Sequence, residues 1–331
     1  MTSALRAGVA PSSVPADHHH SREVLTMSRT PRYASAADTT AHGEYRIDRA
    51  PGDTRPLYRF TGRITADGSS GFRAEPGRYH LYAGWFCPWA QRVTIQRALN
   101  GLEEVVSLSY VDGRRDGRGW AFRETHGPDP VNGFTLLRDA YEATEPGFDG
   151  HISVPTLWDR RTGRVVSNDF TTIGIDLATE FGEWSNGADL YPAELRAEIE
   201  ALDARLGPAV NHGVSAAAGS GPGAPTARAG VLAAFAELDA RLADRRYLLG
   251  ERLTEADVRL WVTLARYDVG ANANRAVNPG LAEYPNLWAY ARDLCTQPAF
   301  SATTDFSTFT APGATLPDWT APHGREKPAA P

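Results

Sequence analysis

Apolar residues in the first half of the chain follow strand and helix patterns in turn. Residues 79–83 read Tyr-His-Leu-Tyr-Ala, an alternating aromatic run that predicts a buried strand. Beyond this run, apolar residues recur at helical spacing from Trp89 to Ala98, which predicts a helix. Residues 152–159 predict a second strand whose latter half begins at Pro155. A hydrogen-bond ladder tolerates proline at the first residue of a strand or in a cis turn.

The second half of the chain shows mainly helical patterns. Helices are predicted over residues 194–206, 227–243, 254–267 and 285–294. The third begins with Thr254-Glu255-Ala256-Asp257, a near match to the capping box, and we assign these residues a structural role only. Residues 216–225 are rich in Ala, Gly, Pro and Ser and predict a mobile loop. Arg259, Arg266 and Asp268 are expected to face solvent, with a buried ion network as the alternative.

A cysteine lies at the junction of the first predicted strand and helix. Cys87 is followed by Pro88, which suits the first turn of a helix because its missing N–H would have no partner there. Free backbone N–H groups and the positive end of the helix dipole favour a thiolate at this position. Such sites lower a cysteine pKa to roughly 3.5–7.5, against about 8.5 for a free thiol. We therefore predict a reactive thiol, with a small buried structural residue as the alternative.

Composition limits the possible classes of protein. The 331 residues are enough for two ordinary domains, and 42% hydrophobic residues with a net charge of −6 describe a globular protein. The charge provides no general attraction to nucleic acid or anionic membranes, and no apolar run reaches the ~18–20 residues that span a bilayer. The two cysteines are far apart, which argues against a disulfide scaffold and suits a reducing cytosol.

The lack of a C-x-x-C motif has a consequence for the predicted redox chemistry. A cycle through Cys87 must be completed by an external thiol, because no second cysteine lies nearby in the sequence. Cys295 ends a predicted helix without a basic neighbourhood, and we assign it a structural role. His18-His19-His20 is too short and isolated to predict a metal site, and Met27 is a candidate translation start.

Four segments follow from these patterns. Strand, Cys-Pro helix, strand, helix, Val-Pro strand and short hairpin is the order of a thioredoxin-like α/β domain, and an all-α domain follows it. The predicted boundaries are 1–45 for a disordered N-terminal segment, 46–185 for the thioredoxin-like domain, 190–310 for the helical domain and 311–331 for an irregular tail.

Seven short motifs carry a resemblance to a known family. They lie at residues 77–82, 87–90, 119–122, 154–159, 165–169, 253–260 and 284–287. Together they resemble the glutathionyl-hydroquinone reductases, the Xi class of the glutathione transferases, over roughly residues 55–315. The resemblance implies the glutathione transferase fold and a homodimer formed through the helical domain.

The resemblance also implies a reaction. The Cys87 thiolate would attack the sulfur of a thioether between a low-molecular-weight thiol and a hydroquinone, releasing the aromatic product and leaving a mixed disulfide. A second thiol would then restore Cys87 without metal or nicotinamide. Two alternatives stay open: omega-like deglutathionylation or dehydroascorbate reduction, and a non-catalytic ligand-binding module.

Six positions are implied to bind the thiol cosubstrate. They are Trp120, His151, Val154, Pro155, Asp169 and Phe170. Trp120 would flank the cosubstrate, and the backbone of Val154 would pair with its cysteinyl group. Asp169 and Phe170 replace a glutamate and a serine that hold the γ-glutamyl group in the family, and His151 replaces an arginine. Because these changes weaken pairing with a carboxylate, mycothiol is an alternative to glutathione as cosubstrate.

The expected aromatic-binding side departs from the family as well. The family's Asn-Asn-Gly-Val-Tyr becomes Asn211-His212-Gly213-Val214-Ser215, and two further tyrosines correspond to Ala271 and Asn274. Gln91 replaces the family histidine after the Cys-Pro-Trp-Ala motif. The candidates for a quinone-type substrate pocket are Tyr82, Trp85, His212 and Tyr267.

Overall fold

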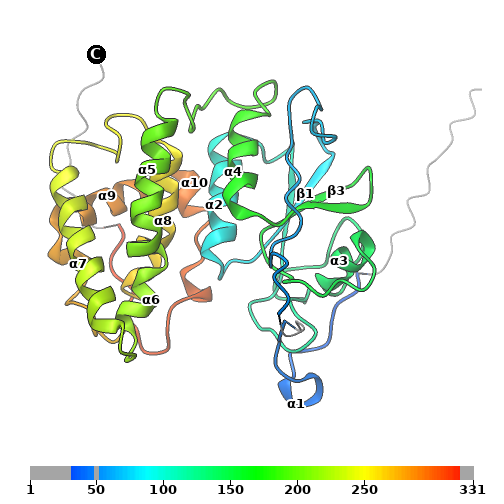
Figure 1. Ribbon diagram of the computed structural model, residues 1–331, viewed down its shortest axis with the longest axis horizontal. Helices are drawn as coiled ribbons and strands as arrows, with labels where there is room; N and C mark the ends of the chain where they lie inside the picture. Colours follow the sequence, from blue (N-terminus) through cyan, green and yellow to red (C-terminus); the bar gives the residue numbers. More distant parts are fainter. Residues whose placement is uncertain (1–30, 48–51, 321–331) are drawn as a thin grey trace, which may run out of the picture. The chain divides into compact units, whose positions relative to one another are not determined.

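A four-stranded mixed sheet organises the N-terminal half of the computed structural model, which describes residues 31–47 and 52–320. Its strands are β1 (Tyr79–Ala83), β2 (Ser107–Tyr110), β3 (Thr156–Asp159) and β4 (Arg164–Ser167), in the order β2-β1-β3-β4. β1 pairs with β2 in parallel, whereas the β1/β3 and β3/β4 pairs are antiparallel (Figure 1). This order is that of a thioredoxin-like domain, as predicted.

Helices cover both faces of the sheet. Helices α2 (Pro88–Leu99) and α4 (Phe170–Thr179) pack together on the face that carries Leu81 and Leu157. Helix α3 (Arg138–Thr144) packs on the opposite face, which carries Tyr82 and Trp158 (Figure 1). All five residues of β1 are buried because both faces are covered.

Two local sequence predictions in this half are confirmed, with one change of boundary. The predicted strand 79–83 coincides with β1, and α2 begins at Pro88 with Cys87 as its N-cap residue. The Val154–Pro155 peptide is cis, and β3 begins only at Thr156. The strand predicted over 152–159 is therefore shorter, because the proline loop precedes the paired residues.

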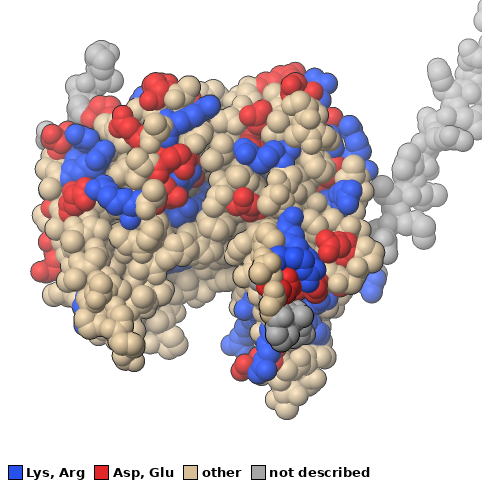
Figure 2. Space-filling view, viewed as in Figure 1, with Lys and Arg blue, Asp and Glu red and all other residues tan. Residues whose placement is uncertain are grey.

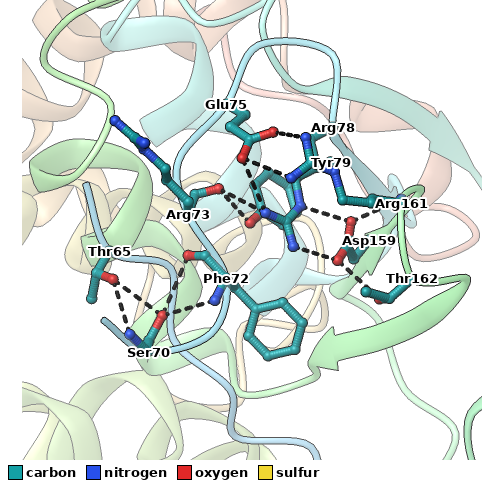
Figure 3. Close-up of polar contacts among 10 residues, drawn as sticks. All are labelled: Thr65, Ser70, Phe72, Arg73, Glu75, Arg78, Tyr79, Asp159, Arg161 and Thr162. Atoms are coloured by element: carbon teal, nitrogen blue, oxygen red, sulfur yellow. Dashed lines mark hydrogen bonds and ion pairs between the residues drawn. The ribbon is translucent and has the colours of Figure 1, made fainter. Parts of the chain in front are cut away.

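Ion pairs tie the first strand to the third (Figure 3). The guanidinium of Arg78 donates to both carboxylate oxygens of Asp159, with Nε–Oδ1 and Nη2–Oδ2 distances of 2.9 and 2.7 Å. Glu75 accepts from Arg78 and from Arg161, while the Thr162 hydroxyl donates to Asp159 Oδ2 at 2.9 Å. Because Arg78 precedes β1 and Asp159 ends β3, the pair fixes the register at this end of the sheet.

The C-terminal half is helical, as predicted. Its helices are α5 (Arg196–Leu206), a π-helical turn (Gly207–Asn211), α6 (Gly213–Ala218), α7 (Ala224–Arg241), α8 (Glu255–Tyr267), α9 (Pro285–Cys295) and α10 (Pro298–Ser301), with 3-10 turns at Leu281–Glu283 and Phe306–Thr308. Helix α8 is buried along almost its whole length and forms the centre of the largest hydrophobic cluster. The predicted capping box is confirmed, since Thr254 and Asp257 exchange both bonds.

Two predictions for this half are wrong. The loop predicted over 216–225 is helical at both ends, because α6 extends to Ala218 and α7 begins at Ala224; alanine is the strongest helix former. Arg259 and Asp268 are buried rather than exposed, at 6% and 8% exposure. Arg266 is also largely enclosed. Arg259 pairs with Glu200, and Asp268 pairs with Arg275. Arg266 donates instead to Gln91 and to backbone carbonyls, so the three do not form the single ion network given as the alternative.

The described part of the N-terminal segment is ordered against the sheet half. Ala34 N–H donates to Phe122 O at 3.0 Å, and Asp38 N–H donates to Asp116 Oδ2 at 3.0 Å. A short helix, α1 (Thr39–His42), follows. The prediction of disorder is therefore wrong for residues 31–45, whereas residues 1–30, with His18–His20 and Met27, lie outside the described residues, as does 321–331 of the predicted tail.

Charged side chains are mixed in sign over the surface in view. Figure 2 shows Lys and Arg interspersed with Asp and Glu, and an uncharged region at the α6 end of the helical half. Residues 213–225, which contain α6, include no charged side chain. Across the described ranges, no helix has both the length and the apolar character needed to cross a membrane.

Candidate active site

Cys87 lies between the α2 N-terminus and the cis-proline loop. Its Sγ accepts a hydrogen bond from Ala90 N–H at 3.5 Å, and its thiol donates to Val154 O at 3.5 Å. Pro88 at the first helical position leaves Ala90 to make this capping bond. The predicted meeting of the cysteine with the Val154–Pro155 loop is thus present in the structure.

The environment of the thiol differs from the prediction in one respect. Only 8% of Cys87 is exposed, and burial raises the pKa of the thiol above its ordinary value. The backbone N–H groups of Ala90 and Trp89 and the charge of Arg266 act in the opposite direction. The prediction that the helix N-terminus lowers the pKa is wrong for the net shift, because loss of hydration outweighs these donors.

Two aromatic residues pack together next to Cys87. Phe86, next to Cys87, packs on Trp120 with ring centroids 4.4 Å apart. Trp120 is half-buried, and the Arg115 guanidinium lies 4.3 Å from its ring centroid. Of the sequence-predicted residues, Val154 thus contacts Cys87 itself and Trp120 contacts its neighbour Phe86.

Asp169 and Phe170 begin helix α4 beside α2. Asp169 caps the helix, and its Oδ1 accepts from Thr171 N–H at 3.0 Å and from the Thr171 hydroxyl at 2.6 Å. Phe170 stacks on Trp89 of α2, with ring centroids 4.8 Å apart. Phe170 thus serves to pack two helices and presents no hydrogen-bonding group.

His151 is held in place by a tyrosine from the N-terminal segment. The Tyr45 hydroxyl lies 3.2 Å from His151 Nδ1 and also accepts from Ile152 N–H at 3.0 Å. Burial, with a contribution from the charge of Arg115, lowers the pKa of His151. Tyr45 and Arg115 were not predicted as site residues: one lies in the segment predicted to be disordered and the other in a polar loop typical of solvent-exposed residues.

A cavity of about 200 Å³ opens at the N-terminus of α2 on its helical-half side. Pro88, Ser215, Arg266, Tyr267 and Ala271 are among its lining residues. Ser215 and Ala271 are two of the positions that the sequence resemblance matches to tyrosines, and the side chain at each is small in this chain. The cavity adjoins the start of the helix that Cys87 caps.

Arg266 connects this cavity to the cysteine loop. Its guanidinium donates to Trp85 O at 3.2 Å, to Val262 O at 3.0 Å and to Gln91 Oε1. Gln91 in turn donates to the Thr304 hydroxyl at 2.6 Å, which joins α2 to the C-terminal segment. Burial lowers the pKa of Arg266 to about 10.

The four residues predicted for the substrate pocket lie in different environments in the structure. Tyr267 lines the cavity, although its hydroxyl donates to Asn278 at 2.9 Å. Trp85 stacks on Tyr110 beside the cysteine loop, with centroids 4.1 Å apart. His212 is exposed and packs on Trp89 at 4.7 Å.

Tyr82 is not brought to the cavity. It is fully buried in the sheet core, where its hydroxyl bonds with Asp129 and Asn132. Asn274 does not line the cavity either. Cys295 is half-buried at the end of α9, and burial raises its pKa to about 11, as suits a structural cysteine.

Comparison with known proteins agrees with this architecture. Residues 188–293 match the family model described as "Glutathione S-transferase, C-terminal domain". Among solved structures, a glutathione transferase from Gordonia bronchialis superposes with a TM-score of 0.74 at 40% identity, covering 80% of this chain and 89% of that one. The glutathione-bound structure of YqjG from Escherichia coli K-12 gives a TM-score of 0.75 at 32% identity, covering 81% and 96%. The fold and the site define a glutathione transferase in which a cysteine, Cys87, is the N-cap residue of helix α2.

Two curated relatives indicate which family of glutathione transferases the chain belongs to. Glutathionyl-hydroquinone reductase PcpF from Sphingobium chlorophenolicum is 40% identical over 229 residues, which cover 66% of this chain and 72% of that protein. Glutathionyl-hydroquinone reductase YqjG from Escherichia coli is 36% identical over 267 residues, covering 76% and 81%. The chain belongs to the glutathionyl-hydroquinone reductase family of the glutathione transferases.

Proposed function

We propose that this protein removes a low-molecular-weight thiol from S-conjugated hydroquinones through a mixed disulfide on Cys87. The observation that carries the proposal is the position of Cys87 between the cis-proline loop and the cavity lined by Pro88. Its thiol contacts the Val154 carbonyl of the cis-proline loop, and Pro88, the next residue, lines the cavity that would hold the aromatic group. One sulfur atom could thus reach both halves of a thioether substrate.

The reaction proceeds in two balanced steps. The Cys87 thiolate attacks the thioether sulfur, a sulfur–sulfur bond forms, and the carbon–sulfur bond breaks with its electron pair leaving on the aromatic carbon. That carbon takes up a proton, which yields the free hydroquinone. A second thiol molecule then attacks the mixed disulfide, forms a symmetric disulfide with the departing thiol and restores the Cys87 thiolate.

Glutathione is the cosubstrate that we propose. The backbone of Val154 would pair with its cysteinyl group, Trp120 would flank it, and the Asp169 carboxylate would accept from the γ-glutamyl ammonium. Phe170 contributes only packing, which is why mycothiol, a thiol with sugar hydroxyls, is the competing cosubstrate. A cycle through a free thiolate requires a reducing compartment, and we propose the cytosol. That the protein forms a homodimer is a prediction from the family resemblance.

The experiment is to incubate the reduced protein separately with glutathionyl-menadiol and mycothiolyl-menadiol, following quinol release and intact mass. We expect release from the glutathionyl conjugate and a thiol adduct that maps to Cys87. Cys87→Ser removes the nucleophile and should abolish both signals. Cys295→Ser is the matched control and should keep full activity, because Cys295 lies outside both the cis-proline loop and the cavity.

Other results would assign another function. Faster release from the mycothiolyl conjugate would make mycothiol the cosubstrate. Turnover of dehydroascorbate or of mixed disulfides, without quinol release, would indicate the omega-like reaction. Neither adduct nor release, with Cys87 present and reduced, would contradict an enzyme of this kind and favour a ligand-binding module.

A further inference from the structure

Arg115 is a cation held between two aromatic rings. The guanidinium carbon lies 4.1 Å from the ring centroid of Tyr45 and 4.3 Å from that of Trp120. The side chain is half-buried, and burial lowers its pKa. Within residues 31–47 and 52–320, no carboxylate lies in ion-pair distance of Arg115, and no oxygen accepts a hydrogen bond from it.

Arg115 also adjoins the thiol site by two routes. Trp120, on which it lies, packs against Phe86, the neighbour of Cys87. Tyr45, its other ring, bonds to His151 and to Ile152 N–H in the segment that leads to Val154. The guanidinium is therefore placed beside the surface at which the proposed cosubstrate would lie.

The arrangement leaves the polar edge of the guanidinium for a ligand. Aromatic faces stabilise the cation but use none of its N–H donors, and a partly buried charge without a counter-ion costs free energy. The planar fork of arginine matches a carboxylate with two parallel hydrogen bonds. Several other arginines of the chain already have such a partner; for example, Arg55 pairs with Asp53 and Arg78 with Asp159.

We propose that Arg115 binds the glycyl carboxylate of glutathione, an assignment that rests on the proposed function for the identity of the thiol surface. The Asp169 carboxylate would repel a carboxylate and suits the ammonium at the γ-glutamyl end. The carboxylate at the opposite end of the peptide is then the one left for Arg115. Mycothiol carries no carboxylate, so Arg115 selects for glutathione between the two candidate thiols.

The test is titration calorimetry with glutathione and with its glycinamide analogue, in which an amide replaces the glycyl carboxylate. We expect the wild-type protein to bind glutathione about tenfold to a hundredfold more tightly than the amide. Arg115→Gln should weaken glutathione binding by that factor and leave amide binding unchanged. Arg115→Lys, which keeps the charge but not the fork, should fall between the two.

The neighbouring residue provides the matched control. Arg114 is exposed on the same loop, so Arg114→Gln makes the same change of charge and should leave both affinities unchanged. Equal weakening of both peptides by Arg115→Gln would overturn the proposal, because it would mean a packing role alone. Equal affinity of the wild-type protein for the two peptides would overturn it even if the variant failed to fold.

Failure of this proposal can be told apart from failure of the proposed function. The binding comparison requires no turnover, since calorimetry reports on the peptide alone. In one outcome, glutathionyl-menadiol is not reduced, while the tighter binding of glutathione than of its glycinamide analogue still depends on Arg115. That result would refute the reductase function and support the assignment of Arg115.

Discussion

The thiol of Cys87 is subject to opposing influences on its ionisation. Burial raises its pKa, whereas Ala90 N–H, Trp89 N–H and the Arg266 guanidinium lower it. The two backbone donors belong to α2 and follow from the Cys-Pro sequence. Arg266 comes from α8, so the charge that favours the thiolate is supplied by the other half of the chain.

Arg266→Gln is expected to raise the pKa of Cys87, because it removes the cationic group that acts on the thiolate. The pH profile of iodoacetamide alkylation should shift to higher pH, and alkylation at neutral pH should slow. Arg205→Gln, an exposed change of the same charge on α5, should leave the profile unchanged. A profile for Arg266→Gln that coincides with the wild-type one would show that Arg266 does not act on the thiol.

Among the elements, strand β1 depends on a buried histidine in its interior. His80 is fully buried and joins β1 to β2, with Nδ1 2.7 Å from Ser107 Oγ and Nε2 2.8 Å from Ser109 Oγ. Burial, followed by the charges of Arg160 and Arg97, lowers its pKa from 6.5 to about 3. The sheet therefore requires the neutral imidazole.

This depressed pKa predicts a dependence of stability on pH. Below pH 6.5 the unfolded chain binds a proton at His80, while the folded chain stays neutral until about pH 3. The stability contribution is full above pH 6.5 and is lost as the pH falls, by about 1.4 kcal/mol per pH unit from this group. Urea unfolding from pH 7 to 4 should show this slope, and His80→Gln should reduce it. An unchanged slope would refute the assignment to His80, and His212→Gln, an exposed site, serves as the control.

At the scale of the whole molecule, an ion network around the buried pair Arg259–Glu255 joins α2 to the helical half. Arg259 of α8 pairs with Glu255 one turn earlier and with Glu200 and Asp203 of α5, at 3.0 and 3.3 Å for the latter two. Arg92 of α2 donates to Arg259 O at 3.4 Å. Burial raises the pKa of Glu255, and the charges of Arg259 and Arg92 oppose that rise.

Removal of the central cation should therefore be costly. Arg259→Met leaves the buried Glu255 carboxylate without its nearest cation, and we expect a loss of about 3–5 kcal/mol in the free energy of unfolding. Arg252→Met is the matched control, because Arg252 is half exposed and its pairs with Asp189 and Glu194 lie at the surface. Its cost should stay within about 1 kcal/mol. Chemical denaturation of both variants measures the difference, and equal costs would contradict a structural role for the network.

Local patterns in the sequence were sufficient for the order of elements and for the position of the proposed nucleophile at the start of a helix. The strand at 79–83, the helix after Cys87 and the proline-led strand each depend on residues that are close in the chain. The capping box at Thr254 is of the same kind. The prediction of a loop over residues 216–225 was wrong at both ends. There the alanines, which favour helix, extend α6 to Ala218 and begin α7 at Ala224.

Tertiary packing decided the properties of the site. Burial of Cys87, the approach of Arg266 and the placing of Arg115 between Tyr45 and Trp120 each join residues far apart in the chain. Local sequence patterns do not show contacts between residues that are far apart in the chain. The free-energy cost of removing a charge from water depends on all the groups packed around it. The sequence by itself thus determined the order of elements and the place of Cys87 at the start of a helix. The three-dimensional packing determined how its thiol ionises and which charges lie around it.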